Sequence, residues 1–294
     1  MGGVNRAMDT LRRHILVFLA GFGPALLLPG AHAQSAVRPG VAPLKFGVHP
    51  YNSTLALIAT HRPLVQYLSR MLAREVEFYT AADFDTYLKA VLAGEYDLAI
   101  CPPHFAVLAM EKDYLPLFHY KSRLEPILAV PSGSGLNAVN DFRGKTIAMA
   151  EPSAFIRIAM VKWLADRGLR AGSDYRIVEK PTHGAAVAAV TLGEADAGLA
   201  TKTTLRQVPI DVRQQLRAVS FGLNFPHMAT LAHRRLGEAG VAAVRTALQA
   251  FPEAAEGREF FGKMEVGGYD VLTADDLHGI EPYVKYQQQL MRGR

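Results

Sequence analysis

The sequence has little of several features that would assign it quickly to a class of protein. Cys101 is its single cysteine, so no disulfide can form within the chain and stability must come from a sizeable apolar core. The 32 Lys and Arg residues are scattered, without a basic run or a stripe of alternating cations and aromatics, so nucleic-acid binding has no support. Histidines at zinc-ligand spacing are absent, and we expect neither a metal nor another cofactor.

The N-terminal region has the pattern of a targeting segment. It carries three arginines within its first 13 residues, an apolar stretch over residues 15–28 and an Ala-His-Ala cleavage pattern that ends at Ala33. Two glycines and a proline interrupt the apolar stretch, which makes it too short to span a membrane comfortably. We therefore predict a signal peptide over residues 1–33, cleavage near Ala33 and Gln34, and a periplasmic mature chain.

Strand-like and helix-like patterns alternate along the mature chain. The first half predicts strand, helix, strand, helix, strand and helix in turn, and a second alternation begins at Thr146. Such alternation favours a mostly parallel sheet flanked by helices. Less regular stretches in between are typical of crossings from one lobe to the other, so we expect an α/β protein with two lobes and two hinge crossings. The expected boundaries are residues 34–125 and 222–294 for lobe 1 and residues 126–221 for lobe 2.

One short unit occurs twice. Gly94-Glu95-Tyr96-Asp97 and Gly193-Glu194-Ala195-Asp196 each follow a helix-like stretch and lead into a short buried-strand pattern. The two copies predict two similarly built lobes. Polar loops follow the strands of both copies, and in open α/β sheets the ligand binds at such strand ends.

The candidate site residues are polar or aromatic residues in these loops. A histidine in such a loop can donate a hydrogen bond to an anion, although each could equally be an ordinary loop residue. The helix that starts near Ser153 offers free backbone N–H groups, and Arg157 on it is either a ligand clamp or a solvated side chain. The expected ligand-binding residues are His49, Tyr51, Cys101, His104, Ser153, Phe155, Arg157, His183, Thr201 and His227, and we expect no catalytic residue.

Cys101 has two interpretations. The preferred one is a small apolar residue that its strand carries into the core. The other places its thiol in the cleft, where His104 could lower its pKa and favour the thiolate.

Several segments of the chain resemble the phosphate- and phosphonate-binding (PhnD-like) receptors of ABC transporters, within the type II periplasmic binding proteins. The resembling segments are residues 44–48, 83–84, 93–99, 144–148, 182–190 and 193–197. The resemblance implies a receptor that closes on a small, anionic ligand, a phosphonate- or phosphate-like oxyanion or a related compound, and delivers it to a transporter permease. It also implies that His183 contacts the ligand. Family members carry several hydroxyl residues at the helix start after Pro152, where this chain has Ser153 alone.

Alternatives to this function come from the same residues. Relatives of this kind also include sensors, so the partner could be a membrane sensor kinase. The family includes receptors thought to bind arsenite through a cysteine, which would suit a thiol at Cys101. A thiol-dependent hydrolase would need Cys101 and a histidine, but no Asp or Asn is evidently placed to orient one, so we expect no enzyme. We expect a monomer.

Overall fold

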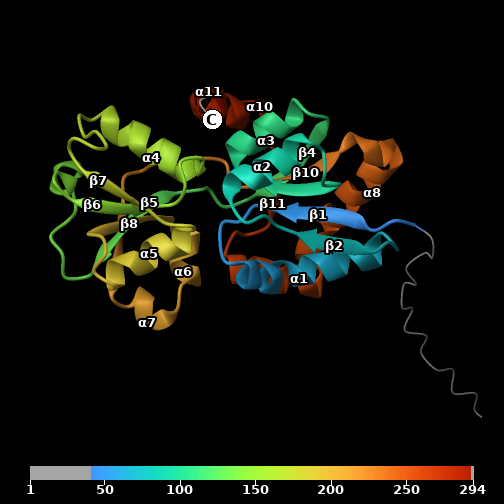
Figure 1. Cartoon of the computed structure of the whole chain (residues 1–294). Coiled ribbons are helices and arrows are strands. Elements are labelled where there is room, and N and C mark those ends of the chain that lie inside the picture. Colours follow the sequence, from blue (N-terminus) through green and yellow to red (C-terminus); the bar gives the residue numbers. More distant parts are fainter. Residues whose placement is uncertain (1–40, 293–294) are drawn as a thin grey trace, which may run out of the picture. The chain divides into compact units, whose positions relative to one another are not determined.

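The computed structural model describes residues 41–292, and the predicted signal peptide lies outside the described residues (Figure 1). The strands are β1 (Leu44–Val48), β2 (Val76–Tyr79), β3 (Leu98–Cys101), β4 (Tyr114–Tyr120), β5 (Pro126–Pro131), β6 (Thr146–Met149), β7 (Arg176–Glu179), β8 (Ala197–Thr201), β9 (Leu216–Ser220), β10 (Ala229–His233) and β11 (Tyr269–Asp270). The α-helices are α1 (Thr54–Met71), α2 (Phe84–Leu92), α3 (Pro103–Met110), α4 (Phe155–Ala165), α5 (His183–Thr191), α6 (Lys202–Gln207), α7 (Ile210–Arg213), α8 (Gly237–Ala250), α9 (Ala255–Met264), α10 (Ala274–His278) and α11 (Glu281–Arg292). Short 3₁₀ helices are η1 (Val139–Phe142), η2 (Arg234–Leu236) and η3 (Phe251–Glu253).

These strands form two sheets, each flanked by helices. The first has the order β11-β4-β10-β3-β1-β2 and the second the order β7-β6-β8-β5-β9. We use lobe 1 for the part of the chain that carries the first sheet and lobe 2 for the part that carries the second. The two-lobed α/β architecture predicted from the sequence is confirmed, while the boundary residues of the lobes stay a prediction.

Both sheets are mixed, which differs from the expected mostly parallel arrangement. In lobe 1, β1 runs parallel to β2 and β3, whereas β10 is antiparallel to β3 and β4. In lobe 2, β6 runs parallel to β7 and β8, whereas β5 is antiparallel to β8 and β9. β10 and β5 are the strands through which the chain enters a lobe from the other one. Each therefore starts at the edge where its neighbours end and runs against them.

The predicted repeat is confirmed as a shared structural unit. The series β1-α1-β2-α2-β3-α3 of lobe 1 has its counterpart in β6-α4-β7-α5-β8-α6 of lobe 2, in matching sheet positions. The carboxylate of Asp97 accepts the N–H of Lys45 at 2.8 Å, and that of Asp196 accepts the N–H of Thr146 at 2.8 Å. In both lobes the repeated aspartate thus ties the start of the first strand to the turn before the third strand.

Helices cover both faces of the first sheet (Figure 1). Leu98 and Ile100 of β3 pack in one apolar cluster with α1, α8 and α9. Ala99 and Cys101 of the same strand pack in another with α2, α3 and Val284 of α11. Successive side chains of a strand point to opposite faces, so β3 is buried on both sides.

Two segments link the lobes, and a C-terminal helix packs against both. Leu124, between β4 and β5, and Phe225, between β9 and β10, exchange backbone hydrogen bonds of 2.9 and 3.1 Å. Arg123 donates to the side-chain oxygens of Asn224 and Asp276, both at 2.9 Å, which joins the two segments to α10. Helix α11 packs on α3 of lobe 1 and on α4 of lobe 2.

Helix α3 is the helix expected after the third strand, whereas α6, α7, α9 and α10 were not expected from the sequence. Helix α3 begins at Pro103, where proline is favoured because that position needs no N–H donor and has the fixed φ of a helix. Helix α6 begins after Thr201, in a run of polar residues that resembles a loop. Within residues 41–292, every helix is too short or too polar to cross a membrane.

Candidate functional site

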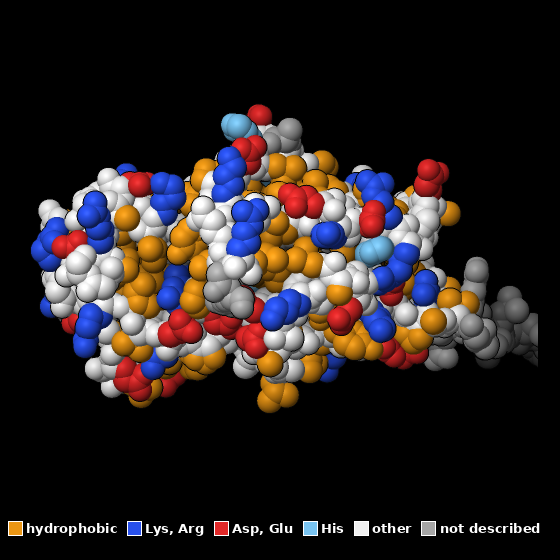
Figure 2. Space-filling model, turned by 45° about the horizontal axis from the view of Figure 1, so that its top comes forward, with side chains coloured by type: hydrophobic (Ala, Val, Ile, Leu, Met, Phe, Trp, Pro, Cys, Tyr) orange, Lys and Arg blue, Asp and Glu red, His pale blue; other side chains and the backbone are white. Residues whose placement is uncertain are grey.

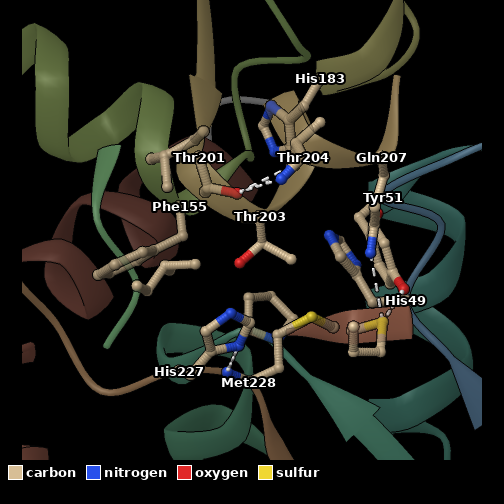
Figure 3. A pocket seen from close by; sticks show the side chains of 14 residues that line it. His49, Tyr51, Phe155, His183, Thr201, Thr203, Thr204, Gln207, His227 and Met228 are labelled. Carbon is tan, nitrogen blue, oxygen red and sulfur yellow. Dashed lines mark hydrogen bonds between the residues drawn. The ribbon is translucent and has the colours of Figure 1, made fainter. Parts of the chain in front are cut away.

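Residues from both lobes, most of them near strand ends and helix starts, line a cavity of about 50 Å³ (Figure 3). Lobe 1 and the linking segments contribute the loops after β1 and β3, residues before β10, and the end of α9; lobe 2 contributes the starts of α4, α5 and α6. This is the edge of the sheets at which open α/β folds bind ligands. The lining residues are His49, Tyr51, Pro102, Leu124, His227, Met228 and Met264 in the first group and Phe155, Ile156, His183, Thr201, Thr203, Thr204 and Gln207 in the second.

Helix α4 starts at this cavity without a side-chain cap. Ala154 holds the N-cap position, and its methyl group cannot accept a hydrogen bond from the first turn. Helix geometry leaves the first N–H groups, those of Phe155 and Ile156 among them, without partners inside the helix. The hydroxyl of Ser153 is fully buried and has no hydrogen-bond partner among the described residues. This helix start can therefore donate to the oxygens of an anion.

The neighbouring backbone fixes the tautomer of His227. The N–H of Met228 donates to Nδ1 of His227 at 2.8 Å, so the proton of the neutral ring must sit on Nε2. Burial lowers the pKa of His227 to about 3, and nearby His119 adds to this effect, so the ring is neutral at pH 7. Its Nε2 atom is buried without a partner among the described residues. His227 thus presents one neutral N–H donor at the cavity.

His49 and His183 bring two further imidazoles to the lining, one from each lobe. The ring of Phe84 lies 4.2 Å from that of His49 and 6.0 Å from that of His183, measured between centroids. Burial lowers the pKa of His183 to about 4, and burial together with the neighbouring histidines His104 and His183 lowers the pKa of His49. Within the described structure the Nδ1 atoms of His49 and His183 are buried and have no partners. Both rings are neutral and keep one nitrogen free for a ligand.

His104 joins the lobes beside the cavity instead of lining it. Its Nε2–H donates to the backbone carbonyl of Ser153 at 3.0 Å, and its ring packs against Phe105 and Phe155. Burial lowers the pKa of His104 to about 3. The bond connects helix α3 of lobe 1 with the loop before α4 of lobe 2, so His104 helps to set how the two lobes meet.

Threonines at the start of α6 supply the hydroxyl groups. Thr201 caps the helix by accepting the N–H of Thr204 at 3.0 Å, and the two hydroxyls lie 3.0 Å apart. Thr203 has no such role in the cap, and its side chain lies in the midst of the lining residues (Figure 3).

A second contact between the lobes lies on the α9 side of the cavity. The sulfur of Met264 accepts hydrogen bonds from the hydroxyl of Tyr51 at 3.5 Å and from the side-chain amide of Gln207 at 3.4 Å. Arg206 and Glu265, the sequence neighbours of Gln207 and Met264, form an exposed ion pair at 2.5 Å. Contacts between the lobes therefore lie on two sides of the cavity.

Charged side chains are absent from the lining, since none of the fourteen lining residues is Lys, Arg, Asp or Glu. Arg157 donates to the carbonyl of Ala150 at 2.6 Å and to Glu179 at 2.9 Å, and it does not line the cavity. These two acceptors hold the guanidinium of Arg157 near the end of β7, so in this structure Arg157 is not placed to clamp a ligand in the cavity. Over the face shown in Figure 2, cationic and anionic side chains are interspersed.

Cys101 also lies away from the lining. It is fully buried, and its sulfur is 3.8 Å from the hydroxyl of Tyr87. Burial raises the pKa of Cys101 to about 12, which keeps the thiol protonated. Cys101 is therefore a core residue, as the preferred interpretation expected, because β3 directs its side chain to the apolar cluster beneath α2 and α3. It does not lie at the cavity, where the list of ligand-binding candidates had placed it.

The cavity thus brings together most, but not all, of the residues proposed from the sequence. Those in the lining are His49, Tyr51, Phe155, His183, Thr201 and His227, whereas Ser153 and His104 adjoin it and Cys101 and Arg157 do not. The lining residues that sequence reasoning missed are Pro102, Leu124, Ile156, Thr203, Thr204, Gln207, Met228 and Met264. The polar run after Thr201 was a signal for Thr203 and Thr204, since it follows the strand of the second repeated unit. Nothing in the sequence pointed to Met264, which α9 brings from far along the chain.

The part of the chain that the structure describes contains no set of side chains that could bind a metal ion. Among residues 41–292, no group of three or more His, Cys, Asp or Glu side chains is placed to hold a metal ion. The site consists of hydroxyls, neutral imidazoles, backbone N–H groups and apolar side chains.

Comparison with known families identifies the kind of protein that carries such a site. Residues 46–277 match the model of a family described as the periplasmic substrate-binding protein of the phosphonate ABC transporter. The chain belongs to this family. Its members are transport proteins that work outside the cytoplasm, with a small-molecule ligand and a membrane permease as partners, and not enzymes.

Individual relatives agree with this membership. The phosphate-import protein PhnD of Mycolicibacterium smegmatis is 24% identical over 187 residues, which cover 55% of this chain and 56% of the relative. The chain thus aligns with just over half the length of that curated relative. The comparisons do not support the alternative functions, a sensor for a membrane kinase or a thiol-dependent hydrolase.

Solved structures show the same fold at low sequence identity. A binding-protein component of an ABC phosphonate transporter from Pseudomonas aeruginosa superposes with a TM-score of 0.75 at 14% identity, covering 84% of this chain and 87% of the other. PhnD1 from Prochlorococcus marinus, solved in complex with methylphosphonate, gives 0.74 at 14% identity over 84% and 98%. At such identities the likeness concerns the fold alone.

Proposed function

We propose that the protein binds a small phosphonate- or phosphate-like oxyanion in the cavity between its lobes and delivers it to the permease of an ABC transporter. The observation that carries the proposal is the uncapped start of α4 at a cavity lined by uncharged side chains. Membership of the phosphonate-binding family supports the same ligand class.

The donors around the cavity suit the oxygens of one phosphoryl group. We expect the N–H groups of Phe155 and Ile156 to hold one oxygen, because they are the free donors of an uncapped first turn. The buried hydroxyl of Ser153 and the Nε2–H of His227 have no partner of their own among the described residues and are available to the others. His183, at the start of α5, can contribute a further hydrogen bond.

Binding by closure of the two lobes follows from how they are joined. The linking segments pair with each other at Leu124 and Phe225, and Leu124 also lines the cavity, so we expect the lobes to rotate about this point. The hydrogen bond from His104 to Ser153 and the bond from Gln207 to Met264 both cross from lobe to lobe. Opening would break these contacts, and a ligand held by both lobes would favour them.

Hydrolysis by a thiol does not fit this site. The buried, protonated thiol of Cys101 lies against Tyr87 and outside the lining, so it cannot act as a nucleophile on a ligand in the cavity. We therefore propose a receptor without enzymatic activity, and purified protein should leave model esters intact.

Export to the periplasm completes the proposal. The basic start and the apolar stretch over residues 15–28 are typical of a signal peptide. N-terminal sequencing of the protein from a periplasmic extract should begin near Gln34, and the mature chain should elute as a monomer. A membrane-bound product that keeps Met1 would contradict the predicted export.

Calorimetric titration tests the binding function. Methylphosphonate and inorganic phosphate should each be tested against the mature protein, and at least one should bind with a stoichiometry of one. His183→Ala should weaken that binding by about 1–3 kcal/mol, because it removes a hydrogen bond to a charged ligand. His278→Ala is the matched control, since the His278 side chain is 83% exposed on α10. Failure of all phosphorus oxyanions to bind would refute the proposal.

A further inference from the structure

Among residues 41–292, none that lines the cavity carries a carboxylate, and this affects which members of the phosphonate class can bind. The lining residues are apolar, hydroxyl-bearing, amide or imidazole residues, without Asp or Glu. The apolar ones, Phe155, Ile156, Leu124, Met228 and Met264, form a large part of it. An ammonium group enclosed there would lose its water without gaining an opposite charge, which is costly unless it is paired.

The acidic residue next to the start of α4 is already engaged. Both carboxylate oxygens of Glu151 lie 3.2 Å from the backbone N–H of Phe84 in lobe 1, and that group donates to them. Glu151 therefore caps α2 across the cleft and is not among the residues that face the cavity.

The small volume of the cavity also limits the size of the ligand. A single water needs about 10–15 Å³ on the same measure of volume, so about 50 Å³ accommodates a few heavy-atom groups. We infer that the site selects compact phosphorus oxyanions whose substituent is a hydrogen, a hydroxyl or a short alkyl group, and that it discriminates against phosphonates that carry an ammonium group. This inference rests on the proposed function and narrows its ligand class.

Two ligands of equal size separate this inference from the proposed function. Ethylphosphonate and aminomethylphosphonate have the same number of heavy atoms. The first ends in a methyl group and the second in an ammonium group. Isothermal titration of the mature protein with methylphosphonate, ethylphosphonate and aminomethylphosphonate should give binding of the alkyl compounds at least tenfold tighter than that of the amino compound. Equal or tighter binding of aminomethylphosphonate would overturn the inference and leave the proposed function intact. Absence of binding by all three, and by phosphite and phosphate, would refute the proposed function itself.

Glu151→Gln provides the internal control. If Glu151 serves only as the cap of α2, the substitution changes the affinities for ethylphosphonate and aminomethylphosphonate by the same factor, and their ratio stays within about twofold of the wild-type ratio. A selective loss of aminomethylphosphonate binding in this variant would identify Glu151 as a carboxylate partner of the ammonium group and would contradict the inference.

Discussion

The carboxylate of Glu151 in lobe 2 accepts the backbone N–H of Phe84 in lobe 1, with both of its oxygens 3.2 Å from that nitrogen. A negative charge at the first turn of α2 is favoured by the helix dipole. Burial raises the pKa of Glu151, while the hydrogen bond from Phe84 acts in the opposite direction. One side chain thus connects the lobes directly beside the start of α4, where the ligand is proposed to bind.

We expect Glu151→Gln to shift the protein towards its open form. The amide oxygen can still accept from Phe84, but it loses the charge that strengthens this bond and its interaction with the dipole. Ligand affinity should fall about threefold to tenfold, and small-angle scattering of the ligand-free variant should give a larger radius of gyration. Glu259→Gln is the control, because Glu259 pairs with Lys263 on the exposed surface of α9. Unchanged scattering and affinity would show that this contact does not govern closure.

His227 should act through its Nε2–H donor, and two substitutions distinguish this from a packing role. In His227→Gln the terminal amide can reach the region of Nε2 and still donate to the ligand. In His227→Asn the shorter side chain can accept the N–H of Met228 but cannot reach the cavity. Asn should cost about 1.5–3 kcal/mol of binding free energy and Gln clearly less, measured by calorimetry with methylphosphonate. Equal losses in both variants would argue against the donor role.

The buried histidines should make the protein less stable in weak acid. Burial lowers the pKa of His61 and His183 to about 4 and of His104 and His227 to about 3. In the unfolded chain a histidine binds its proton near pH 6.5, so the unfolded state holds more protons below that pH. Stability is therefore full above about pH 6.5 and is lost as pH falls towards 4, by up to about 1.4 kcal/mol per pH unit for each histidine.

Urea unfolding at pH 7.5, 6.0 and 5.0 measures this effect on the free energy of unfolding. His61→Gln should reduce the slope by about one proton, because His61 is fully buried and lies outside the cavity lining. The exposed His278 serves as the control, and its replacement by Gln should leave the slope as it is. A free energy of unfolding that is the same at all three pH values would contradict the neutral, buried state of these rings.

Cys101 should be inert in the native protein. Its thiol is fully buried and held protonated, so a thiol reagent should label it only after denaturation, and ligand should make no difference to the native rate. The rate of labelling at pH 8 with and without methylphosphonate is the measurement. Rapid labelling that the ligand prevents would place the thiol at the cavity and restore the interpretation as a thiol site.

The sequence predicted the fold well because each lobe is specified locally. The repeated Gly-Glu-x-Asp unit ends a helix in both lobes. Gly94 and Gly193 adopt positive φ values of 69° and 71° at these helix ends, a conformation that glycine allows. The predicted cap of α2 is present as well, since Asp83 accepts the N–H of Thr86 at 2.6 Å. Such short-range patterns can be read from a single sequence.

The site could be predicted only in part because it depends on contacts between distant segments. His49, His183 and His227 were found because His49 follows β1, His183 begins α5 and His227 lies just before β10. Whether Cys101 and Arg157 face the cavity depends on their acceptors and packing partners, Tyr87 for the former and Glu179 for the latter. Met264 reaches the cavity through the packing of α9 on lobe 1, a contact that residue spacing does not reveal.

A crystal structure of the complex with methylphosphonate would show whether the ligand binds at the start of α4. We expect a phosphoryl oxygen within about 3.2 Å of the backbone nitrogens of Phe155 and Ile156, with the Nε2 of His227 bonded to another oxygen and the bond from His104 to Ser153 in place. A ligand bound at another surface, or in the cavity without a contact to the start of α4, would contradict this prediction.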